Sequence, residues 1–281
     1  MPPMIAVVTD STAYLGEAEA ARQGIAVVTL RVAYDGQIIE DRTPIDTSAV
    51  ADALRGGATT SRPSPQLFTD VYGEAAAQGA TGIVSVHLSG ELSGTVDSAL
   101  VSAREAPIPV EVIDSRSIAM GLGFPVLAAA QAARRGAALA DVVSAARRCA
   151  DVTRTFFYVD TLEHLRRSGR IGAAANLVGS ALAIKPLMRL GDGPITVVEK
   201  VRTAGRAIAR LEDLAVEVAA DEPVNVAVQH LMASARAGAL AESLSARLPG
   251  LVRMMVVEVG PALGAHVGPG LLGVTVSTAT E

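Results

Sequence analysis

The feature that most constrains the fold is the alternation of short apolar runs with amphipathic helical patterns. In the first part of the chain the runs of strand length are residues 5–9, 25–32, 83–86 and 110–113. Helical patterns separate them, which predicts an α/β domain with a largely parallel sheet. Asp35-Gly36 predicts one local hairpin, between Val32 and Ile39.

A second set of strands follows Arg154. We expect them at residues 156–159, 183–188, 195–201, 224–229, 252–257 and 272–276, with helices between them. Gly191-Asp192-Gly193 predicts a tight antiparallel turn, so the second sheet should be mixed. We place the boundary near residue 160. The predicted architecture is thus two α/β domains, residues 1–160 and 161–281.

Composition excludes several classes of protein. Apolar residues make up 50% of the 281 and aromatic residues only 3%, so Ala, Val, Leu and Ile must build the core. A net charge of -5 and scarce aromatics argue against a nucleic-acid partner. The N-terminal apolar run has no charged start and reads as a strand, not a secretory signal. Residues 118–133 are too short and interrupted for a membrane span and predict a buried helix. With Cys149 as the single cysteine, a reducing cytoplasm is expected.

Two hydroxyl-rich loops open onto predicted helices. Residues 59–65 precede a helical pattern at residues 66–78, with Ser64 as the expected N-cap. Residues 89–95 lie between a strand at residues 82–86 and a helix at residues 96–104. Free N–H groups and the helix dipole at such junctions attract a carboxylate or phosphate. The alternative is that these hydroxyl groups only cap helices.

Common catalytic motifs are missing from the sequence. It contains no G-x-S-x-G, G-x-x-x-x-G-K-[ST] or H-E-x-x-H motif, which weakens serine hydrolase, P-loop and zincin interpretations. Residues 268–273 match G-x-G-x-x-G but precede an expected final strand, so no helix can follow in the dinucleotide-binding manner. We interpret this backbone as one that must approach a ligand or a neighbouring strand closely.

The four histidines are isolated in the sequence. We expect structural roles for three of them, His87, His164 and His230. His266 lies among glycines at positions 264, 268 and 270, in an expected flexible turn that presents its imidazole to an anion.

Other polar segments follow predicted strands or helices. Asp10-Ser11-Thr12 and Asp114-Ser115 each end a strand, where they are either ligand contacts or ordinary turns with an Asx hydrogen bond. The basic run at residues 166–170 is either a solvated helix end or an electrostatic rim of an anion site.

Eight separated motifs, in this order, resemble those of DegV-type fatty-acid-binding proteins over nearly the whole chain. They are Val8-Thr9-Asp10-Ser11-Thr12, Thr60-Ser61-Arg62-Pro63-Ser64, Leu92-Ser93-Gly94-Thr95, Ile113-Asp114-Ser115, Leu165-Arg166-Arg167-Ser168-Gly169-Arg170-Ile171, Ile184-Lys185-Pro186, Glu199-Lys200-Val201-Arg202-Thr203, and residues 266–273.

The resemblance implies two α/β domains with an apolar tunnel between or beneath them that holds one long-chain fatty acid. The carboxylate would be bound by Thr60 and Ser93, with His266, Ser61 and Gly94 in the same site. It implies a carrier and not an enzyme, with no cofactor apart from the bound lipid and with peripheral membrane contact during lipid exchange.

A partner is implied as well. Where the family is paired with a separate fatty-acid kinase, the resemblance implies that this partner phosphorylates the bound carboxylate and docks on basic residues of the Val-Arg-Thr segment. Arg202 matches that segment, and Arg206 is the second candidate docking residue. The chain departs from the family pattern at Arg62, which replaces a Gln and adds a charge beside the head-group site. Val96 replaces a Tyr, which removes one aromatic hydroxyl group. Ala204-Gly205 replaces basic residues that the family often carries in the segment used for kinase docking.

Two alternatives to the carrier remain open. The first is an enzyme acting on a small phosphate or acyl ester, with Asp10 or His266 as the base. The second is an interaction protein with a vestigial pocket.

Overall fold

The structure is a computed structural model that describes residues 4–44, 48–172, 184–190 and 193–279. The chain forms two compact units. The first comprises Met1–Arg31 and Ser61–Asp151, and the second comprises Val32–Thr60 and Val152–Glu281. The backbone therefore passes from one unit to the other three times. The units divide after residues 31, 60 and 151. The single domain boundary near residue 160 stays a prediction.

The first unit contains a four-stranded sheet in the order β2-β1-β6-β7, and every pair is parallel, as predicted. Its strands are β1 (Ile5–Asp10), β2 (Ile25–Val28), β6 (Gly82–His87) and β7 (Val110–Asp114). The prediction of one strand over residues 25–32 is wrong. The run splits into β2 and β3 (Arg31–Tyr34), which belong to different sheets.

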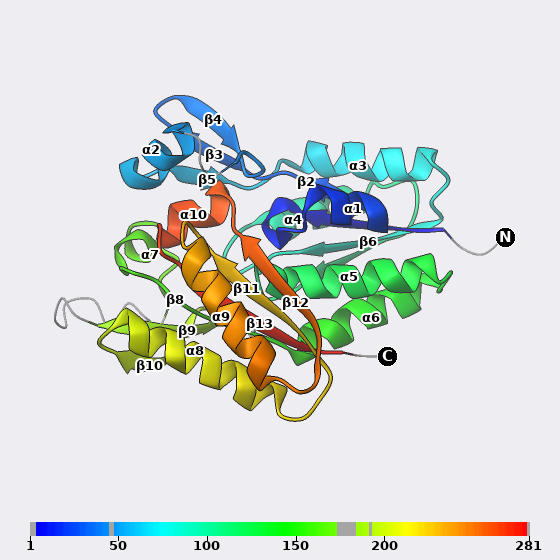
Figure 1. Cartoon of the computed structure of the whole chain (residues 1–281). Coiled ribbons are helices and arrows are strands. Elements are labelled where there is room, and N and C mark those ends of the chain that lie inside the picture. The colour runs from blue at the N-terminus through cyan, green and yellow to red at the C-terminus, as the bar shows by residue number, and fades with distance from the viewer. Residues whose placement is uncertain (1–3, 45–47, 173–183, 191–192, 280–281) are drawn as a thin grey trace. The chain divides into compact units, whose positions relative to one another are not determined.

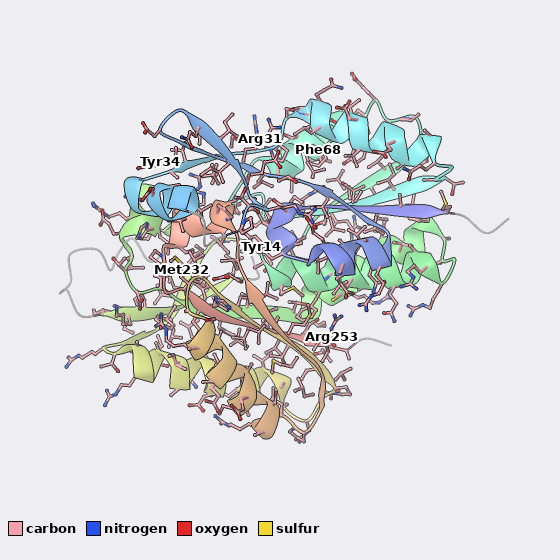
Figure 2. All side chains as sticks on the ribbon, turned by 45° about the horizontal axis from the view of Figure 1, so that its top comes forward. Tyr14, Arg31, Tyr34, Phe68, Met232 and Arg253 are labelled. Atoms are coloured by element: carbon pink, nitrogen blue, oxygen red, sulfur yellow. The ribbon has the colours of Figure 1, made fainter. Side chains whose placement is uncertain are left out.

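Helices lie on both sides of this parallel sheet, with α3 and α5 on opposite faces (Figure 1). The helices of the unit are α1 (Glu17–Gln23), α3 (Pro65–Ala77), α4 (Thr95–Ala103), α5 (Met120–Arg134) and α6 (Leu139–Val152), with a short 3₁₀ turn at Ser11–Ala13. Phe68 (Figure 2) and Tyr72 of α3 are fully buried against Val8 and Ile83. Helix α5 is largely buried, as predicted for residues 118–133.

The second unit contains a mixed six-stranded sheet in the order β10-β9-β8-β13-β11-β12. Only β11 and β12 pair in parallel, which confirms the predicted mixed sheet. The strands are β8 (Thr153–Tyr158), β9 (Lys185–Leu190), β10 (Thr196–Val201), β11 (Val224–His230), β12 (Leu251–Glu258) and β13 (Leu272–Thr278). Residue 183 of the predicted strand and residues 191–192 of the predicted turn lie outside the described residues.

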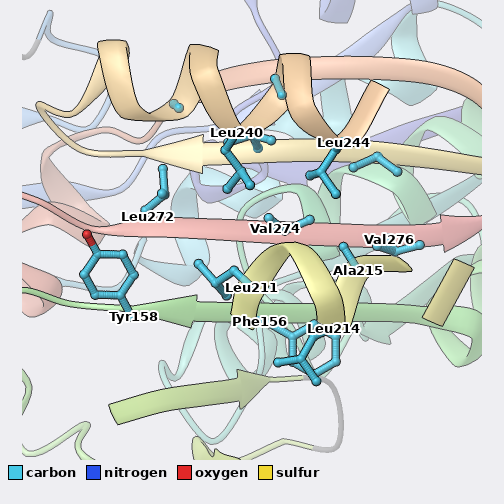
Figure 3. Packing of buried hydrophobic residues seen from close by; sticks show 14 of the residues in the cluster. Phe156, Tyr158, Leu211, Leu214, Ala215, Leu240, Leu244, Leu272, Val274 and Val276 are labelled. Atoms are coloured by element: carbon cyan, nitrogen blue, oxygen red, sulfur yellow. The ribbon is translucent and has the colours of Figure 1, made fainter. Parts of the chain in front are cut away.

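Two long helices, α8 (Ala204–Ala219) and α9 (Ser234–Arg247), cover one face of the six-stranded sheet. Figure 3 shows how their leucines pack on the central strands. The buried cluster includes Leu211, Leu214, Leu240 and Leu244 of the helices and Leu272, Val274 and Val276 of β13. This core is mainly aliphatic, as the composition predicted. Its few aromatic members come from β8.

A small sheet in the order β4-β3-β5 completes the described fold. Strands β3 and β4 (Gln37–Glu40) form the predicted hairpin, with positive φ angles of 47° at Asp35 and 72° at Gly36. Helix α2 (Ser48–Gly56) follows it, and Gly56 leaves room for Tyr34 of β3 (Figure 2), whose ring a Cβ there would overlap. The remaining helices are α7 (Glu163–Arg167) and α10 (Pro261–Val267).

Both hydroxyl-rich loops depart in detail from the prediction. Thr59–Ser61 forms the short strand β5, whereas a loop was expected. Ser64 occupies the N-cap position of α3 with Pro65 in the first turn, as predicted, but its side chain makes no capping hydrogen bond. The hydroxyl group of Ser64 therefore does not cap α3, as the capping interpretation would require.

Candidate functional site

The carboxyl ends of the parallel strands bring the polar motifs of the first unit together. Ser115, after β7, donates from its backbone N–H to the carbonyl of His87 on β6 at 3.0 Å. Gly90 N–H donates to the Asp114 carboxylate at 3.1 Å. The loop after β6 is thus tied to the end of β7, and this is the edge where open α/β sheets bind ligands.

Asp10 ends β1 and is fully buried. Its Oδ1 accepts from the backbone N–H of Thr12 at 3.1 Å and from the Thr12 hydroxyl group. This confirms the Asx turn. Its Oδ2 accepts from His87 Nδ1 and from Leu88 N–H, both at 3.0 Å. The two Oδ1 contacts close the turn after β1, and the two Oδ2 contacts join β1 to the end of β6 and the start of the loop that follows. A carboxylate used in this way is poorly placed to act as a base, which weakens the enzyme interpretation that relied on Asp10.

A buried hydrogen-bond chain continues from His87. Its Nε2 is 2.7 Å from Ser85 Oγ, which accepts from the Tyr72 hydroxyl group at 2.8 Å. Burial raises the pKa of Tyr72 to about 12, so the phenol stays protonated and donates. Because the Tyr72 hydroxyl group donates to Ser85, the Ser85 hydroxyl group donates to Nε2 of His87, and Nδ1–H of His87 donates to the Asp10 carboxylate. The expected structural role of His87 is confirmed.

The loop after β6 carries Ser93 to the start of α4. The backbone N–H of Ser93 donates to Ser89 O at 3.1 Å, and its hydroxyl group lies 3.0 Å from that of Thr95. Gly94 is the N-cap residue and has no side chain with which to cap the helix. Ser93 and Gly94 are both half-buried, and the predicted order of strand, loop and helix is confirmed.

In the second unit, Thr60 Oγ1 lies 2.7 Å from Nε2 of His266. The prediction grouped these two residues in one site, and the fold brings them together although 206 positions separate them. Burial, with a smaller effect of the Arg170 charge, lowers the pKa of His266 to about 4, so the imidazole is neutral at pH 7. Its Nδ1 is buried and has no hydrogen-bond partner among the described residues.

His266 does not lie in a flexible turn, as was expected, but in the last turn of helix α10. The glycine-rich turn follows the helix. A Cβ at Gly268 would overlap the ring of His164, and one at Gly270 would overlap the carboxylate of Asp160. The prediction of close backbone approach is therefore confirmed, and the neighbouring groups in the structure are these two side chains.

The remaining predicted residues lie on the surface. Ser61 is exposed, and its hydroxyl group donates to Arg31 O at 3.5 Å. Arg202 and Arg206 are exposed and line a hollow of about 420 Å³ on the surface of β10 and α8. Glu199, Lys200 and Arg210 line it too, and Arg210 is ion-paired with Glu199.

Two other histidines also have neighbours. His164 Nδ1 is 3.3 Å from Arg167 Nη2, and burial with this charge lowers the pKa of His164. His230 Nδ1 lies 3.6 Å from the Glu258 carboxylate. Within the described ranges no group of three His, Cys, Asp or Glu side chains could hold a metal ion. In the same ranges, no helix is both long and apolar enough to cross a bilayer.

Comparison with known proteins identifies the family. A sequence profile described as "Uncharacterised protein, DegV family" matches residues 4–279. A DegV domain-containing protein of Streptomyces coelicolor is 54% identical over 276 residues, covering 98% of each chain.

Solved structures agree. One is called "Fatty Acid Binding of a DegV family Protein from Thermus thermophilus". It has a TM-score of 0.91 and 32% identity, covering 98% of this chain and 100% of that one. DegV from Bacillus subtilis, called a fatty acid binding protein, has a TM-score of 0.89 and 30% identity, covering 99% and 100%. The chain belongs to the DegV family.

Proposed function

We propose that this chain binds a long-chain fatty acid and presents its carboxylate without catalysing a reaction. The observation that carries the proposal is the contact of the Thr60 hydroxyl group with a neutral, buried His266 at 2.7 Å. Two DegV proteins with at least 30% identity to this chain are named for fatty-acid binding, which supports the same ligand class here.

The proposed role of His266 is to orient Thr60. If Nε2–H donates to Thr60 Oγ1, the hydroxyl proton of Thr60 is free to donate to a carboxylate. Because the low pKa keeps the imidazole neutral, it adds no charge that would compete for the head group. Ser93, at the start of α4, is the second proposed donor. Ser61 follows Thr60 in the sequence, and Gly94 follows Ser93.

The energetics favour a carrier whose head-group site supplies hydrogen-bond donors. Burial of an acyl chain gains roughly 0.8 kcal/mol per methylene, so about fifteen methylenes supply on the order of 12 kcal/mol before entropy and ordering costs. A carboxylate cannot enter apolar surroundings without hydrogen-bond partners. Hydroxyl and N–H donors satisfy it and leave it reachable for a partner enzyme.

The first experiment identifies the ligand. The purified protein is denatured and the released small molecules are analysed by mass spectrometry, and the delipidated protein is then titrated with palmitic acid. We expect Ser93→Ala and Thr60→Val each to weaken binding by about 1.5 to 3 kcal/mol, the usual range for a hydrogen bond to a charged group.

Ser144→Ala is the matched control for these variants. It removes a hydroxyl group on α6 that donates only to Ala140 O within the described part of the chain. Its affinity should equal that of the wild type. Absence of any released lipid together with no palmitate binding would refute the carrier function. Hydrolysis of acyl phosphate or ester substrates by the isolated protein would favour the enzyme alternative.

Presentation to a fatty-acid kinase is the second part of the proposal. Arg202 and Arg206 are exposed around one hollow, which suits them to an acidic partner surface. Arg202→Glu with Arg206→Glu should lower the rate of acyl-phosphate formation by a fatty-acid kinase and leave palmitate affinity unchanged. Arg135→Glu, on exposed surface at the end of α5, is the control. Equal rates for all variants would exclude this docking surface.

A further inference from the structure

Gly94 has a close neighbour, the side chain of Arg62. Its φ of −75° is open to any residue, so the backbone does not require glycine there. A Cβ on Gly94, however, would lie 3.0 Å from Arg62 Cδ and 3.3 Å from Cζ, with Nη1 closer still. The missing side chain thus lets the guanidinium of Arg62 lie directly on the backbone beside Ser93.

Within the described part of the chain, the charge of Arg62 has no partner. The side chain is exposed and makes no hydrogen bond or ion pair with the residues that the structure describes. Three other surface arginines, Arg166, Arg210 and Arg247, are each paired with a carboxylate. Arg62 therefore combines a defined position against Gly94 with five donors that are open to a ligand.

We propose that Arg62 determines the selectivity of the head-group site for an ionised carboxylate over a neutral lipid head group. This inference rests on the proposed fatty-acid binding. Hydroxyl groups such as that of Ser93 bond an alcohol or an ester as well as a carboxylate. A guanidinium beside them attracts an anion and donates a stronger hydrogen bond to it than to a neutral oxygen, so it separates acid from alcohol.

The test measures the affinity of the full-length, delipidated protein for palmitic acid and for cetyl alcohol, at low and high salt. The variants are Arg62→Gln and Arg62→Lys. Arg62→Gln should weaken palmitate binding about five- to tenfold at low salt and change cetyl alcohol binding less than about twofold, because only the acid carries charge. The salt dependence of palmitate binding should decrease in Arg62→Gln and persist in Arg62→Lys.

Gly94→Ala provides an independent route to the same site. Its Cβ would displace the guanidinium while the negative φ leaves the start of α4 intact, so palmitate selectivity should fall as it does in Arg62→Gln. Combining the two substitutions should cause no further loss, because Gly94→Ala acts through Arg62.

The outcomes separate the inference from the proposed function. If the wild type binds palmitate and Arg62→Gln binds it equally well, the inference about Arg62 is wrong and the carrier function stands. Equal weakening for acid and alcohol would assign Arg62 a packing role only and would also overturn the inference. A wild type that binds neither ligand would overturn both.

Discussion

At the scale of single residues, His266 makes stability depend on pH. Its pKa falls from an ordinary value of 6.5 to about 4 in the folded protein. Between these values the unfolded chain binds the proton and the folded chain does not. The contribution of His266 to the unfolding free energy is therefore fully present above pH 6.5 and is lost as the pH falls towards 4. The loss is up to about 3 kcal/mol, since one pKa unit corresponds to about 1.4 kcal/mol.

Urea unfolding of the wild type and of His266→Gln measures this contribution. Gln keeps a hydrogen bond to Thr60 but does not titrate, so the stability of the wild type relative to the variant should decrease from about pH 7 to about pH 4.5. Other titrating groups cancel in the difference. A difference that stays constant with pH would show that His266 is not held neutral by burial.

A second residue prediction concerns Asp10. In Asp10→Asn an NH₂ group replaces one of the two carboxylate oxygens. Each of these oxygens accepts from two donors, one from Thr12 and the other from His87 and Leu88. A donor then faces donors in a buried site, and we expect a loss of about 3 kcal/mol in unfolding free energy. Tyr72→Phe removes only the end of the same chain and should cost about 1 kcal/mol. Equal losses would contradict a central role for Asp10.

The sequence indicates each member of this network but not the network itself. Asp10 and His87 are visible as polar residues that end apolar runs. Their contact depends on the pairing of β1 with β6, in which Thr9 lies opposite Val86, and no local pattern specifies that register. The contact of Thr60 with His266 could be proposed only from family resemblance, for the same reason. Arg62 was suspected from its charge, but its position on Gly94 needed the fold.

At the scale of elements, the glycine-rich turn before β13 should tolerate no side chain. Gly270 has a φ of +87°, and a Cβ there would overlap the carboxylate of Asp160. Gly270→Ala should therefore lower the unfolding free energy by about 2 kcal/mol or more, from backbone strain and displacement of Asp160. Thermal or urea unfolding measures the loss.

Gly238, within α9, is the matched control. A Cβ there meets no atom within 4 Å. Gly238→Ala should stabilise the protein by roughly 0.5 to 1 kcal/mol, because alanine loses less conformational entropy than glycine in a helix. If both substitutions changed the unfolding free energy in the same direction, the close approach of Asp160 to Gly270 would not be the deciding factor.

Elements that depend on local pattern were predicted well, and those that depend on distant partners were not. Helix α3 begins at Pro65, as predicted, and the Asp35-Gly36 hairpin forms because the turn chemistry is local. Strand β5 at Thr59–Ser61 exists only through its pairing with β3, which hydroxyl-rich sequence does not reveal. For residues 25–32, a continuous apolar run concealed the point at which the chain leaves one sheet for another.

At the scale of the whole molecule, the first unit should fold without the second. Its parallel sheet, its helices and the buried chain from Asp10 to Tyr72 all come from residues up to 31 and from 61 to 151. The two ends left by removing residues 32–60 are close, because the Ser61 hydroxyl group donates to Arg31 O at 3.5 Å. A chain in which a short glycine linker joins these ends should unfold cooperatively in urea.

The fragment 161–281 should not fold, because it lacks β8. That strand pairs with β9 on one side and β13 on the other, so its removal cuts the six-stranded sheet in two. It also lacks Asp41, whose carboxylate accepts the N–H of Ala262 at the start of α10. Circular dichroism and the dispersion of amide proton shifts in NMR spectra would distinguish the two shortened chains. If the fragment 161–281 did fold, its strands would form a sheet without β8. That result would support a domain boundary near residue 160.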